Sequence, residues 1–530
     1  MEIRPAVSVR GALAVPGDKS ISHRALLVGA VCEGDLVVHG FGRSLDTEST
    51  MAAVSELGAE IVEEDLDTLR VRGVGLHGLR EPGRSIDCGN AGTLARLLPG
   101  LLAGQEGRRF ELTGDESLRS RPMDRIADPL GAMGAHVTTS DGRLPMTIEG
   151  APITGIEHEP AAASAQVKSC LLLAGLYAAG GTTVVERVPT RDHTERMLRA
   201  AGAHVVTRRA RVFVRPVERL ELDRVDVPGD FSSAAPFIVA ATLLPGSELI
   251  LRGVGVNPAR TGLLDALERM GARISLFNRR TVSGEPVADI DVAHAELVAT
   301  EVGPADVPRM VDELPLFALA AGMARGVSRV RGAGELRQKE TDRIETVSTA
   351  LRALGLHVAA THAGFRVRGV PTRPRGGVMS AAGDHRIAIL GAVAGLVSSD
   401  GARMEGAEAA AVSFPGFFDL LDSLAQRGSS PSTDRPEPAR ARSHAYLRSG
   451  SACGISTPGR CTVRSRGSRC ATTCRSTMVS ASGGSPPATR SSSMCTGGWR
   501  SLARTSPPRS VTPASTVRCP SSRAIRRCVR

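Results

Sequence analysis

The sequence has no run of 18 apolar residues, so it offers no segment with the length and composition of a membrane-spanning helix. Its first residues, MEIRPAVSVRG, lack the positive-then-apolar order of a secretory signal. The segment 1–428 contains only Cys32, Cys88 and Cys170 and no Cys-x-x-Cys pair, a usage that suits a reducing compartment. These absences predict a cytoplasmic protein that does not bind membranes. With 42% apolar residues, the 530-residue chain has enough material for several packed domains.

Acidic residues are nearly missing from the segment 429–530, which carries 18 Arg, no Lys and only Asp434 and Glu437. The segment 1–428 holds 48 basic and 53 acidic side chains, a net charge of −5. The overall charge of +11 therefore comes entirely from the end of the chain. A nucleic-acid-binding protein would need its positive charge on the folded part, so we expect no nucleic-acid partner.

The segment 428–530 is rich in Ser, Pro and Arg and has no periodic apolar pattern, so it cannot bury enough surface to offset its chain entropy. One interpretation is a disordered basic tail that touches anionic surfaces. A second is a metal-binding module, although its cysteine spacings fit no zinc template. A third, which we favour, is a shifted reading frame in GC-rich DNA. We therefore predict a low-complexity tail that is disordered or frame-shifted, and we assign it no function.

A helix, a Gly stop and a β-hairpin recur along the rest of the chain. Each joint follows an apolar-periodic helix and precedes an alternating strand, and Gly there fits the left-handed residue that ends a helix. The joint glycines recur at similar intervals along the chain. They are Gly58, Gly134, Gly202, Gly271 and Gly355.

The repeat predicts six units in two groups of three. A sixth helix, from Phe417 to about Gln426, has no strands after it, so we expect the N-terminal strands to close the sixth unit. The similar segments VPGDKS at 15–20 and VPGDFS at 227–232 each open a helix and predict two chain crossings between domains. We expect one domain over 1–16 plus 229–427 and another over 17–228, with a ligand cleft between them.

Lysine occurs only at Lys19, Lys168 and Lys339, while Arg supplies every other base. A compact ammonium is not replaced by a planar guanidinium, so a Lys that persists in such an Arg-rich sequence points to a specific need. The alternative is chance survival of three codons. Lys19 lies in PGDKSISHR, which is not a P-loop but opens a helix whose free N–H groups favour an anion. An ordinary Ser N-cap is the structural alternative there.

Three further charged motifs are candidates for the same cleft. We expect Lys339 and Arg343 to share one face of a helix with Glu340 beside them; the alternative is a solvated charged face. Asp312 and Asp384 each precede an apolar helix, and a capping role is the alternative for both.

Taken together, these residues resemble the 5-enolpyruvylshikimate-3-phosphate synthases, or 3-phosphoshikimate 1-carboxyvinyltransferases, over residues 5 to 425. The motifs that carry the resemblance are LAVPGDKSISHR from Leu13, GNAGT from Gly89, SRPM from Ser120, SAQVKS from Ser164, RDHT from Arg191, LRQKETDR from Leu336 and DHR from Asp384. The resemblance implies a two-domain inside-out α/β barrel, each domain made of three helix-plus-sheet repeats.

The same resemblance implies transfer of the enolpyruvyl group of phosphoenolpyruvate to the 5-hydroxyl of 3-phosphoshikimate, with release of phosphate. It implies no metal or organic cofactor, and we expect a monomer. Gly92 is retained, so we expect inhibition by glyphosate.

The chain departs from the family pattern at two positions. Val412 stands where the family often has a Lys before Ser/Thr-Phe-Pro, and a bacterial subgroup of the family also lacks this Lys. Gln338 replaces a commoner Val.

By resemblance, the acceptor 3-phosphoshikimate is bound by Lys19, Ser20, Arg24, Ser164, Gln166, Arg191, Asp312 and Lys339. The residues implied for phosphoenolpyruvate are Lys19, Gly92, Arg121, Gln166, Arg343 and Arg386. We assign Asp312 as the base toward the 5-hydroxyl and Glu340 as the acid toward the methylene carbon, with Lys19 as a rival proton carrier.

The charge load agrees with this assignment. The two substrates together bring about six negative charges, which repel unless cations match them. Arg96 is one of the motif bases that could neutralise these charges, although it could instead support its own loop. The nearest rival is an enolpyruvyl transferase acting on a UDP-amino sugar. That family uses a Cys on a mobile loop, where this chain has SLRS at 117–120.

Overall fold

The five joint glycines all have left-handed backbones in the computed structural model, which describes residues 1–427. Their φ angles lie between 87° and 109°, a region that a side chain disfavours and Gly tolerates. Each therefore ends its helix as the repeat predicts. The helices that these joints end are α2 (Leu45–Glu56), α5 (Asp124–Met133), α7 (His193–Ala200), α9 (Gly262–Arg269) and α11 (Arg343–Ala353).

The strands form six sheets, and four of these share one plan, in which a parallel pair at one edge is followed by an antiparallel hairpin. One of the four contains β14 (Arg224–Asp226), β3 (Asp35–His39), β5 (Leu69–Arg72) and β4 (Glu60–Glu63). The second contains β6 (Ile86–Asp87), β7 (Arg109–Thr113), β9 (Arg143–Glu149) and β8 (His136–Ser140). The third contains β10 (Glu157–His158), β11 (Thr182–Val185), β13 (Arg211–Val214) and β12 (Val205–Arg208). The fourth contains β18 (Glu301–Val302), β19 (Gly326–Val330), β21 (Gly364–Gly369) and β20 (His357–Thr361).

The N-terminal strands complete the other two sheets. The fifth sheet follows the common plan with one added strand and contains β16 (Arg273–Val282), β17 (Glu285–Ala293), β15 (Glu248–Gly255), β2 (Ser8–Ala14) and β24 (Ala425–Gln426). The sixth contains β1 (Glu2–Ile3), β23 (Ala402–Glu405) and β22 (Gly377–Ser380). Because β1 pairs antiparallel with β23, the N-terminus closes the sixth unit as expected. The sixth helix is shorter than expected, since α13 (Phe417–Leu424) gives way to β24, which pairs with β2.

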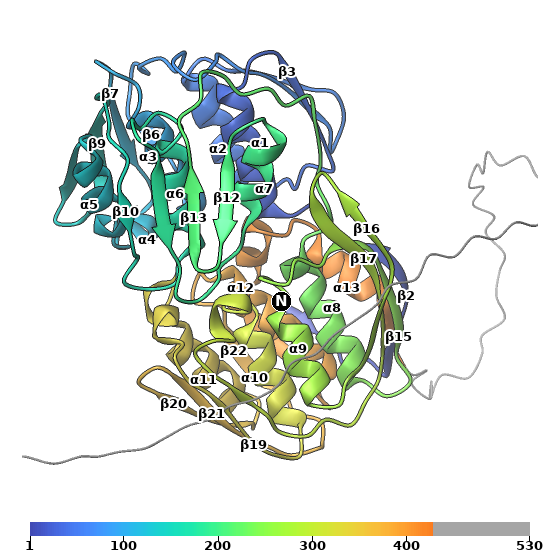
Figure 1. Cartoon of the computed structure of the whole chain (residues 1–530). Helices are drawn as coiled ribbons and strands as arrows, with labels where there is room; N and C mark the ends of the chain where they lie inside the picture. The colour runs from blue at the N-terminus through green and yellow to red at the C-terminus, as the bar shows by residue number, and fades with distance from the viewer. Residues whose placement is uncertain (428–530) are drawn as a thin grey trace, which may run out of the picture. The chain divides into compact units, whose positions relative to one another are not determined.

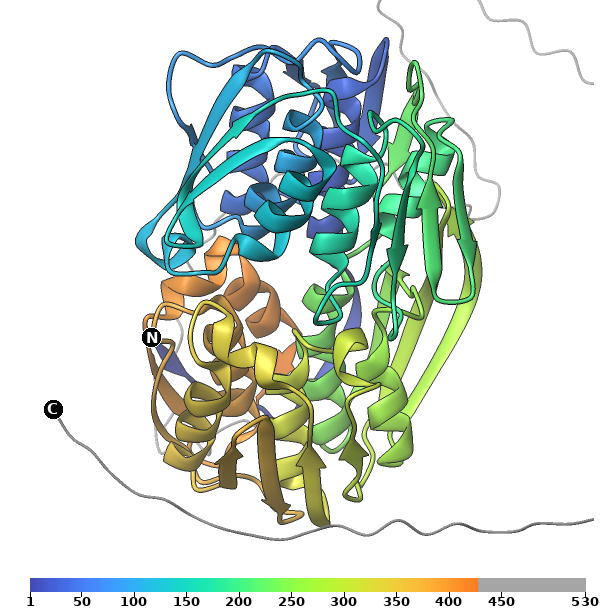
Figure 2. The same cartoon turned by 60° about the vertical axis from the view of Figure 1, so that its left-hand side comes forward.

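Six helices are buried inside the sheets of the described chain. All thirteen residues of α8 (Phe231–Leu243) are buried, and α8 packs on α10 (Leu314–Met323) and α12 (His385–Val397). In the other group, α3 (Gly92–Leu102) packs on α1 (Lys19–Val31) and α6 (Ala165–Ala174). Figures 1 and 2 show the sheets on the outside of these helices, so the inside-out α/β fold is confirmed. Shorter helical segments are α4 (Glu116–Arg119), η1 (Val307–Arg309), η2 (Gly334–Gln338) and η3 (Ala407–Val412).

The apolar side chains form two separate clusters. The first core draws on residues 21 to 227, and the second core on residues 3 to 15 and 231 to 424. The two chain crossings lie side by side, because Asp18 N–H donates to the Pro228 carbonyl and Asp230 N–H donates to the Pro16 carbonyl, each at 2.8 Å. The side chains of Asp18 and Asp230 then cap α1 and α8, so both buried helices start at this junction.

The predicted tail at 428–530 lies outside the described residues. Among residues 1–427, none of the helices is both long enough and apolar enough to cross a membrane.

Candidate active site

A cavity of about 550 Å³ is lined by residues from both of the chain segments that carry the two hydrophobic cores. It gathers twelve of the thirteen site residues expected from the sequence, from segments as far apart in the chain as those of Lys19 and Arg386. Basic side chains that the sequence could only place on distant motifs therefore share one space. The twelve are Lys19, Ser20, Gly92, Arg121, Ser164, Gln166, Arg191, Asp312, Lys339, Glu340, Arg343 and Arg386.

Arg24 is the expected residue that does not line this cavity. Its buried guanidinium donates to the Ser20 carbonyl at 2.8 Å, to Thr194 Oγ1 at 2.7 Å and to Ser169 Oγ at 2.9 Å. Burial lowers the pKa of Arg24 to about 10 despite nearby carboxylates. In this structure Arg24 braces the start of α1, and its contact with substrate stays a prediction.

The N-terminus of α1 presents Lys19 and Ser20 to the cavity. The structural alternative, a Ser N-cap, is wrong, because Asp18 caps the helix by accepting from Ile21 N–H at 2.9 Å. Ser20 is therefore left uncommitted to capping. Lys19 Nζ donates to Asp46 Oδ2 at 2.7 Å, which holds the ammonium at the cavity wall.

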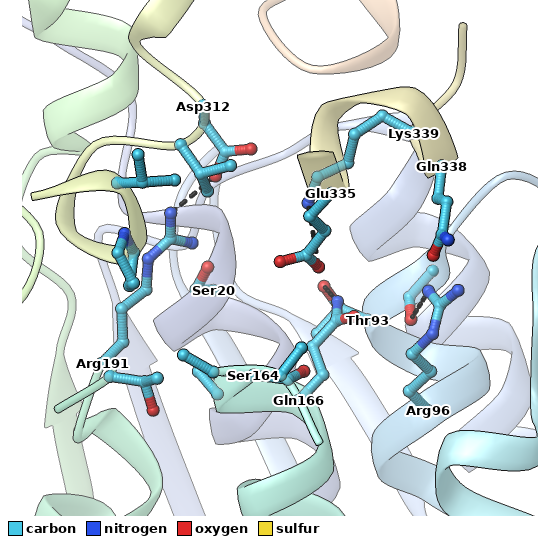
Figure 3. Close-up of a pocket in the computed structure, with 18 of the residues that line it drawn as sticks. Ser20, Thr93, Arg96, Ser164, Gln166, Arg191, Asp312, Glu335, Gln338 and Lys339 are labelled. Atoms are coloured by element: carbon cyan, nitrogen blue, oxygen red, sulfur yellow. Dashed lines mark hydrogen bonds and ion pairs between the residues drawn. The ribbon is translucent and has the colours of Figure 1, made fainter. Parts of the chain in front are cut away.

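Asp312 lies opposite Arg191, whose Nη2 donates to Asp312 Oδ2 at 2.6 Å (Figure 3). Arg343 Nη1 lies 3.6 Å from the other carboxylate oxygen. Burial raises the pKa of Asp312, but the charges of Arg191, Lys339, Arg386 and Arg343 outweigh it and hold the pKa well below its usual range. Asp312 does not cap α10, because no side chain caps the N-terminus of that helix. Asp312 is thus an ionised acceptor facing the cavity.

Glu340 sits between two guanidinium groups. Arg343 Nη2 donates to Glu340 Oε2, and Arg121 Nη1 lies 3.5 Å from Glu340 Oε1. Burial raises the pKa of Glu340, but Arg343, His385, Arg121 and Lys339 together hold it well below its usual range. Beside these cations Glu340 is therefore ionised.

The helix expected to carry Lys339 and Arg343 on one face is wrong. α11 begins at Arg343 because Asp342 caps it, and Lys339 follows the 3-10 helix η2. Both side chains still line the cavity, Lys339 from the end of η2 and Arg343 from the first turn of α11. Arg343 is fixed by Asp384, which accepts from Nε at 2.8 Å and from Nη2 at 3.1 Å. Asp384 also caps α12, so its capping role is confirmed alongside this second contact.

The GNAGT segment approaches the cavity closely at Gly92. A Cβ there would lie 2.8 Å from Arg96 Nη1 and 3.3 Å from Arg121 Nη1, so a side chain would intrude between two guanidinium groups. Arg121 Nη2 donates to Asn90 Oδ1 at 2.7 Å. Arg96 donates to the Gly92 carbonyl at 3.2 Å and also lines the cavity, so it supports its loop while facing the same space.

The start of α6 brings uncharged hydrogen-bonding side chains to the cavity wall. Ser164 caps this helix by accepting from Val167 N–H, and Gln166 Nε2 donates to Thr93 Oγ1 at 3.3 Å. Figure 3 places Ser164 and Gln166 on the same side of the cavity as Ser20. Helix starts at α1 and α6 thus both open toward the ligand space.

Sequence reasoning missed two basic residues of the cavity, Arg125 and Arg260. Arg125 Nη2 donates to Gln338 Oε1 at 2.9 Å and lies 3.5 Å from Glu335, which links the two walls. Arg260 donates to Asp230 Oδ1 at 2.8 Å and lies 3.4 Å from Asp18, so it joins the two crossings. Neither stands in one of the motifs, and no signal in the single sequence separates them from the many other arginines.

Charge decides what the cavity can hold. Its lining has nine Lys or Arg side chains against five carboxylates, which leaves four positive charges unmatched. A cavity with that surplus favours ligands with several negative charges. Among the described residues, no group of three or more His, Cys, Asp or Glu side chains is arranged to hold a metal ion.

Comparison with known proteins identifies the family that carries this site. A model of the family described as EPSP synthase (3-phosphoshikimate 1-carboxyvinyltransferase) matches residues 3–421. The chain belongs to the EPSP synthase family. A 3-phosphoshikimate 1-carboxyvinyltransferase from Geobacter sp. strain M21 is 48% identical over 427 residues, which cover 80% of this chain and 99% of the relative. One from Synechococcus sp. strain WH7803 is 47% identical over 80% of this chain and 98% of its own.

Solved structures give the same result for the EPSP synthase fold. EPSP synthase from Acinetobacter baumannii matches with a TM-score of 0.72 and 39% identity, over 80% of this chain and 98% of that one. The enolpyruvyl transferase NikO from Streptomyces tendae matches with a TM-score of 0.65 over 80% and 96% of the two chains. At 18% identity, the second likeness concerns the fold alone.

Proposed function

We propose that this protein transfers the enolpyruvyl group of phosphoenolpyruvate to the 5-hydroxyl of 3-phosphoshikimate. The products are 5-enolpyruvylshikimate 3-phosphate and phosphate, in the shikimate pathway to chorismate and the aromatic amino acids. The observation that carries the proposal is the convergence of the family motifs on one cavity with a surplus of four positive charges. Each substrate bears a phosphate and a carboxylate, and guanidinium groups pair with both kinds of anion in bidentate fashion.

The two substrates divide the cavity between them. Arg191, Ser164, Gln166, Ser20 and Lys339 hold 3-phosphoshikimate, with Arg24 behind them. Arg121, Arg343 and Arg386 hold phosphoenolpyruvate, and Gly92 lets the backbone approach it. Lys19 and Gln166 contact both substrates. The lack of a side chain at Gly92 leaves space beside Arg96 and Arg121, which supports binding of glyphosate in place of phosphoenolpyruvate.

The reaction is an addition followed by an elimination. In the addition, the 5-hydroxyl oxygen bonds to C2 of phosphoenolpyruvate, the hydroxyl proton leaves, and a proton joins the methylene carbon. In the elimination, that carbon gives up a proton and the C2–O bond to phosphate breaks. One group must accept a proton while another donates one, and each must return to its first state in the second step.

Asp312 is the base toward the hydroxyl, because its lowered pKa keeps it ionised before substrate arrives. Glu340 is the proton donor to the methylene carbon. It must first take up a proton, and the incoming anions favour this because they compete for the same guanidinium groups that now lower its pKa. Lys19 stays a rival carrier, since its ammonium faces the same space.

The two hydrophobic cores support a division into domains at 1–16 plus 229–427 and at 17–228, hinged at the paired crossings. The protein acts on small molecules as a cytoplasmic monomer without nucleic-acid or membrane partners. The net charge of −5 over the segment 1–428 supports the absence of nucleic-acid binding.

Phosphate release from phosphoenolpyruvate tests the function directly. The full-length protein should release phosphate with 3-phosphoshikimate and not with a UDP-amino sugar as acceptor. The SLRS segment at 117–120, where a UDP-amino sugar enzyme would use Cys, supports this preference. Release with the UDP-amino sugar alone would overturn the proposal.

A further inference from the structure

Lys168 is one of three lysines in the chain, and it does not line the cavity. Its side chain is 1% exposed, in the second turn of α6. Burying an ammonium is costly unless it is paired and fully hydrogen-bonded. A buried ammonium at this position therefore needs hydrogen-bond acceptors or carboxylates close to it.

The ammonium meets three oxygen atoms. Lys168 Nζ lies 2.7 Å from Glu195 Oε1, 2.9 Å from Glu186 Oε2 and 3.3 Å from the Thr190 carbonyl oxygen. An ammonium has three N–H donors, so every donor has an acceptor within hydrogen-bond distance. A guanidinium is planar and larger, and it cannot place one nitrogen among three oxygens in so closed a space.

Two of these oxygens belong to the loop 186–192, which joins β11 to α7. Glu186 also accepts from the Thr190 backbone N–H at 3.1 Å and from the Thr190 hydroxyl. Lys168 and Glu186 together hold Thr190 by both its N–H and its carbonyl. The next residue is Arg191, which lines the cavity and donates to Asp312.

We propose that Lys168 is a positioning residue for the acceptor substrate, acting through Glu186 and Thr190 to place the Arg191 guanidinium in the cavity. The inference rests on the proposed function, in which Arg191 is one of the residues that hold 3-phosphoshikimate. It assigns the buried lysine a role in affinity for one substrate. It also explains why an ammonium persists here in a chain that has Arg at all but three of its Lys and Arg positions.

The test compares Lys168→Met, Lys168→Arg and Glu186→Gln with the full-length wild type. Each variant should raise KM for 3-phosphoshikimate by ~10-fold or more, as expected for a displaced charge-assisted hydrogen bond, while KM for phosphoenolpyruvate changes by less than ~2-fold. Lys168→Arg should not restore the wild-type KM, because the guanidinium keeps the positive charge but is too large and planar to replace the ammonium. Equal rises in both KM values, or wild-type KM values in Lys168→Arg, would overturn the proposal.

A double-mutant cycle separates positioning from general stability. In an Arg191→Ala background, Lys168→Met should add less than ~2-fold to KM for 3-phosphoshikimate, because the group that it places is already gone. Independent, multiplying effects would contradict the inference. Should Lys168→Met fail to fold, Glu186→Gln takes its place in the cycle, since it keeps the pair between Lys168 and Glu195.

A matched control is Gln105→Leu, because Gln105 is buried near the end of α3 and donates to the Leu76 carbonyl at 2.7 Å, away from the cavity. It should lower the unfolding midpoint and leave both KM values unchanged. Wild-type activity is measured first: its absence with 3-phosphoshikimate would defeat the proposed function. Activity with an unchanged acceptor KM in Lys168→Met would defeat only the role of Lys168.

Discussion

At the scale of single residues, the site is governed by which carboxylates stay charged. Asp312 and Glu340 are partly buried, and neighbouring cations hold the pKa of each well below its usual range. In the proposed function the same cations hold the substrates. Substrate binding would then change the surroundings of the proposed acid and base just before proton transfer.

Asp312→Asn keeps the shape of the side chain and removes its capacity to take a proton. We expect kcat to fall by ~100-fold or more, the usual contribution of a general base. Steady-state phosphate release measures it. Asp265→Asn serves as the control, because Asp265 pairs with Arg309 at 2.6 Å on an exposed surface and does not line the cavity. Turnover of Asp312→Asn equal to that of the control would remove Asp312 as the base.

His23 makes stability depend on pH. Its ring is fully buried and hydrogen-bonded to Thr50 at 2.7 Å, and burial lowers its pKa to about 3, against ~6.5 when unfolded. Between these values the unfolded chain binds a proton that the folded chain does not, so stability falls as the pH falls below ~6.5. One such His accounts for a loss of ~2 kcal/mol between pH 7 and pH 5.

In His23→Gln that share of the loss should disappear, as measured by urea unfolding at both pH values. The comparison is between the two pH values within each variant, so any general destabilisation cancels. His357→Gln, at an exposed position on β20, should keep the wild-type pH dependence. An unaltered pH dependence in His23→Gln would show that the His23 ring has the same pKa in the folded and unfolded chains.

At the scale of elements, helix ends place the reactive groups. Asp18, Ser164 and Asp384 cap α1, α6 and α12, and each cap lies beside residues that line the cavity. At the C-terminal ends of five other helices, a joint glycine ends the helix and leads the chain into a hairpin. Each repeat unit is therefore defined by the residues that begin and end its helices.

Two exposed glycines with open space around them allow this element-scale argument to be tested. Gly202 ends α7 with φ at 89°, while Gly131 lies inside α5 in ordinary helical conformation. Gly202→Ala should lower the free energy of unfolding by ~1–2 kcal/mol, the cost of a left-handed residue with a Cβ. Gly131→Ala should raise it by ~0.5–1 kcal/mol. Chemical denaturation measures both, and changes of the same sign would refute the argument.

At the scale of the whole described chain, the proposed function brings the positively charged walls of the cavity closer together. Arg191 reaches Asp312 and Arg121 approaches Glu340, so ion pairs already cross between segments of the two cores. The remaining surplus of positive charge opposes closer approach until an anion enters. The crossings at Asp18 and Asp230, tied by Arg260, are the place where such motion would turn.

We expect the radius of gyration in small-angle X-ray scattering to fall when 3-phosphoshikimate is added. The physical reason is that the ligand neutralises the cations that face each other across the cavity. Shikimate without its phosphate is the matched control and should produce a smaller change. An identical scattering profile with and without 3-phosphoshikimate would contradict ligand-driven closure.

Local rules made much of this protein predictable from its sequence. Glycine stops, Asp caps and apolar periodicity act within a few residues, so the helix-and-hairpin repeat and the motif residues could be found without coordinates. The limits appear both at a local cap that the pattern did not reveal and in contacts between distant segments. The helix expected over Lys339 and Arg343 was wrong because a cap at Asp342 started the helix later, and Arg24 turned inward to brace α1.

The sequence alone determined the repeating unit, the motif residues and the separation of charge between the segment 1–428 and the segment that follows it. The three-dimensional fold was needed to show that Arg125 and Arg260 join the cavity, that Lys168 contacts the loop of Arg191, and which guanidinium faces which carboxylate. These facts depend on contacts between segments far apart in the chain, and electrostatic pairing is set by distance in space, which no local pattern records.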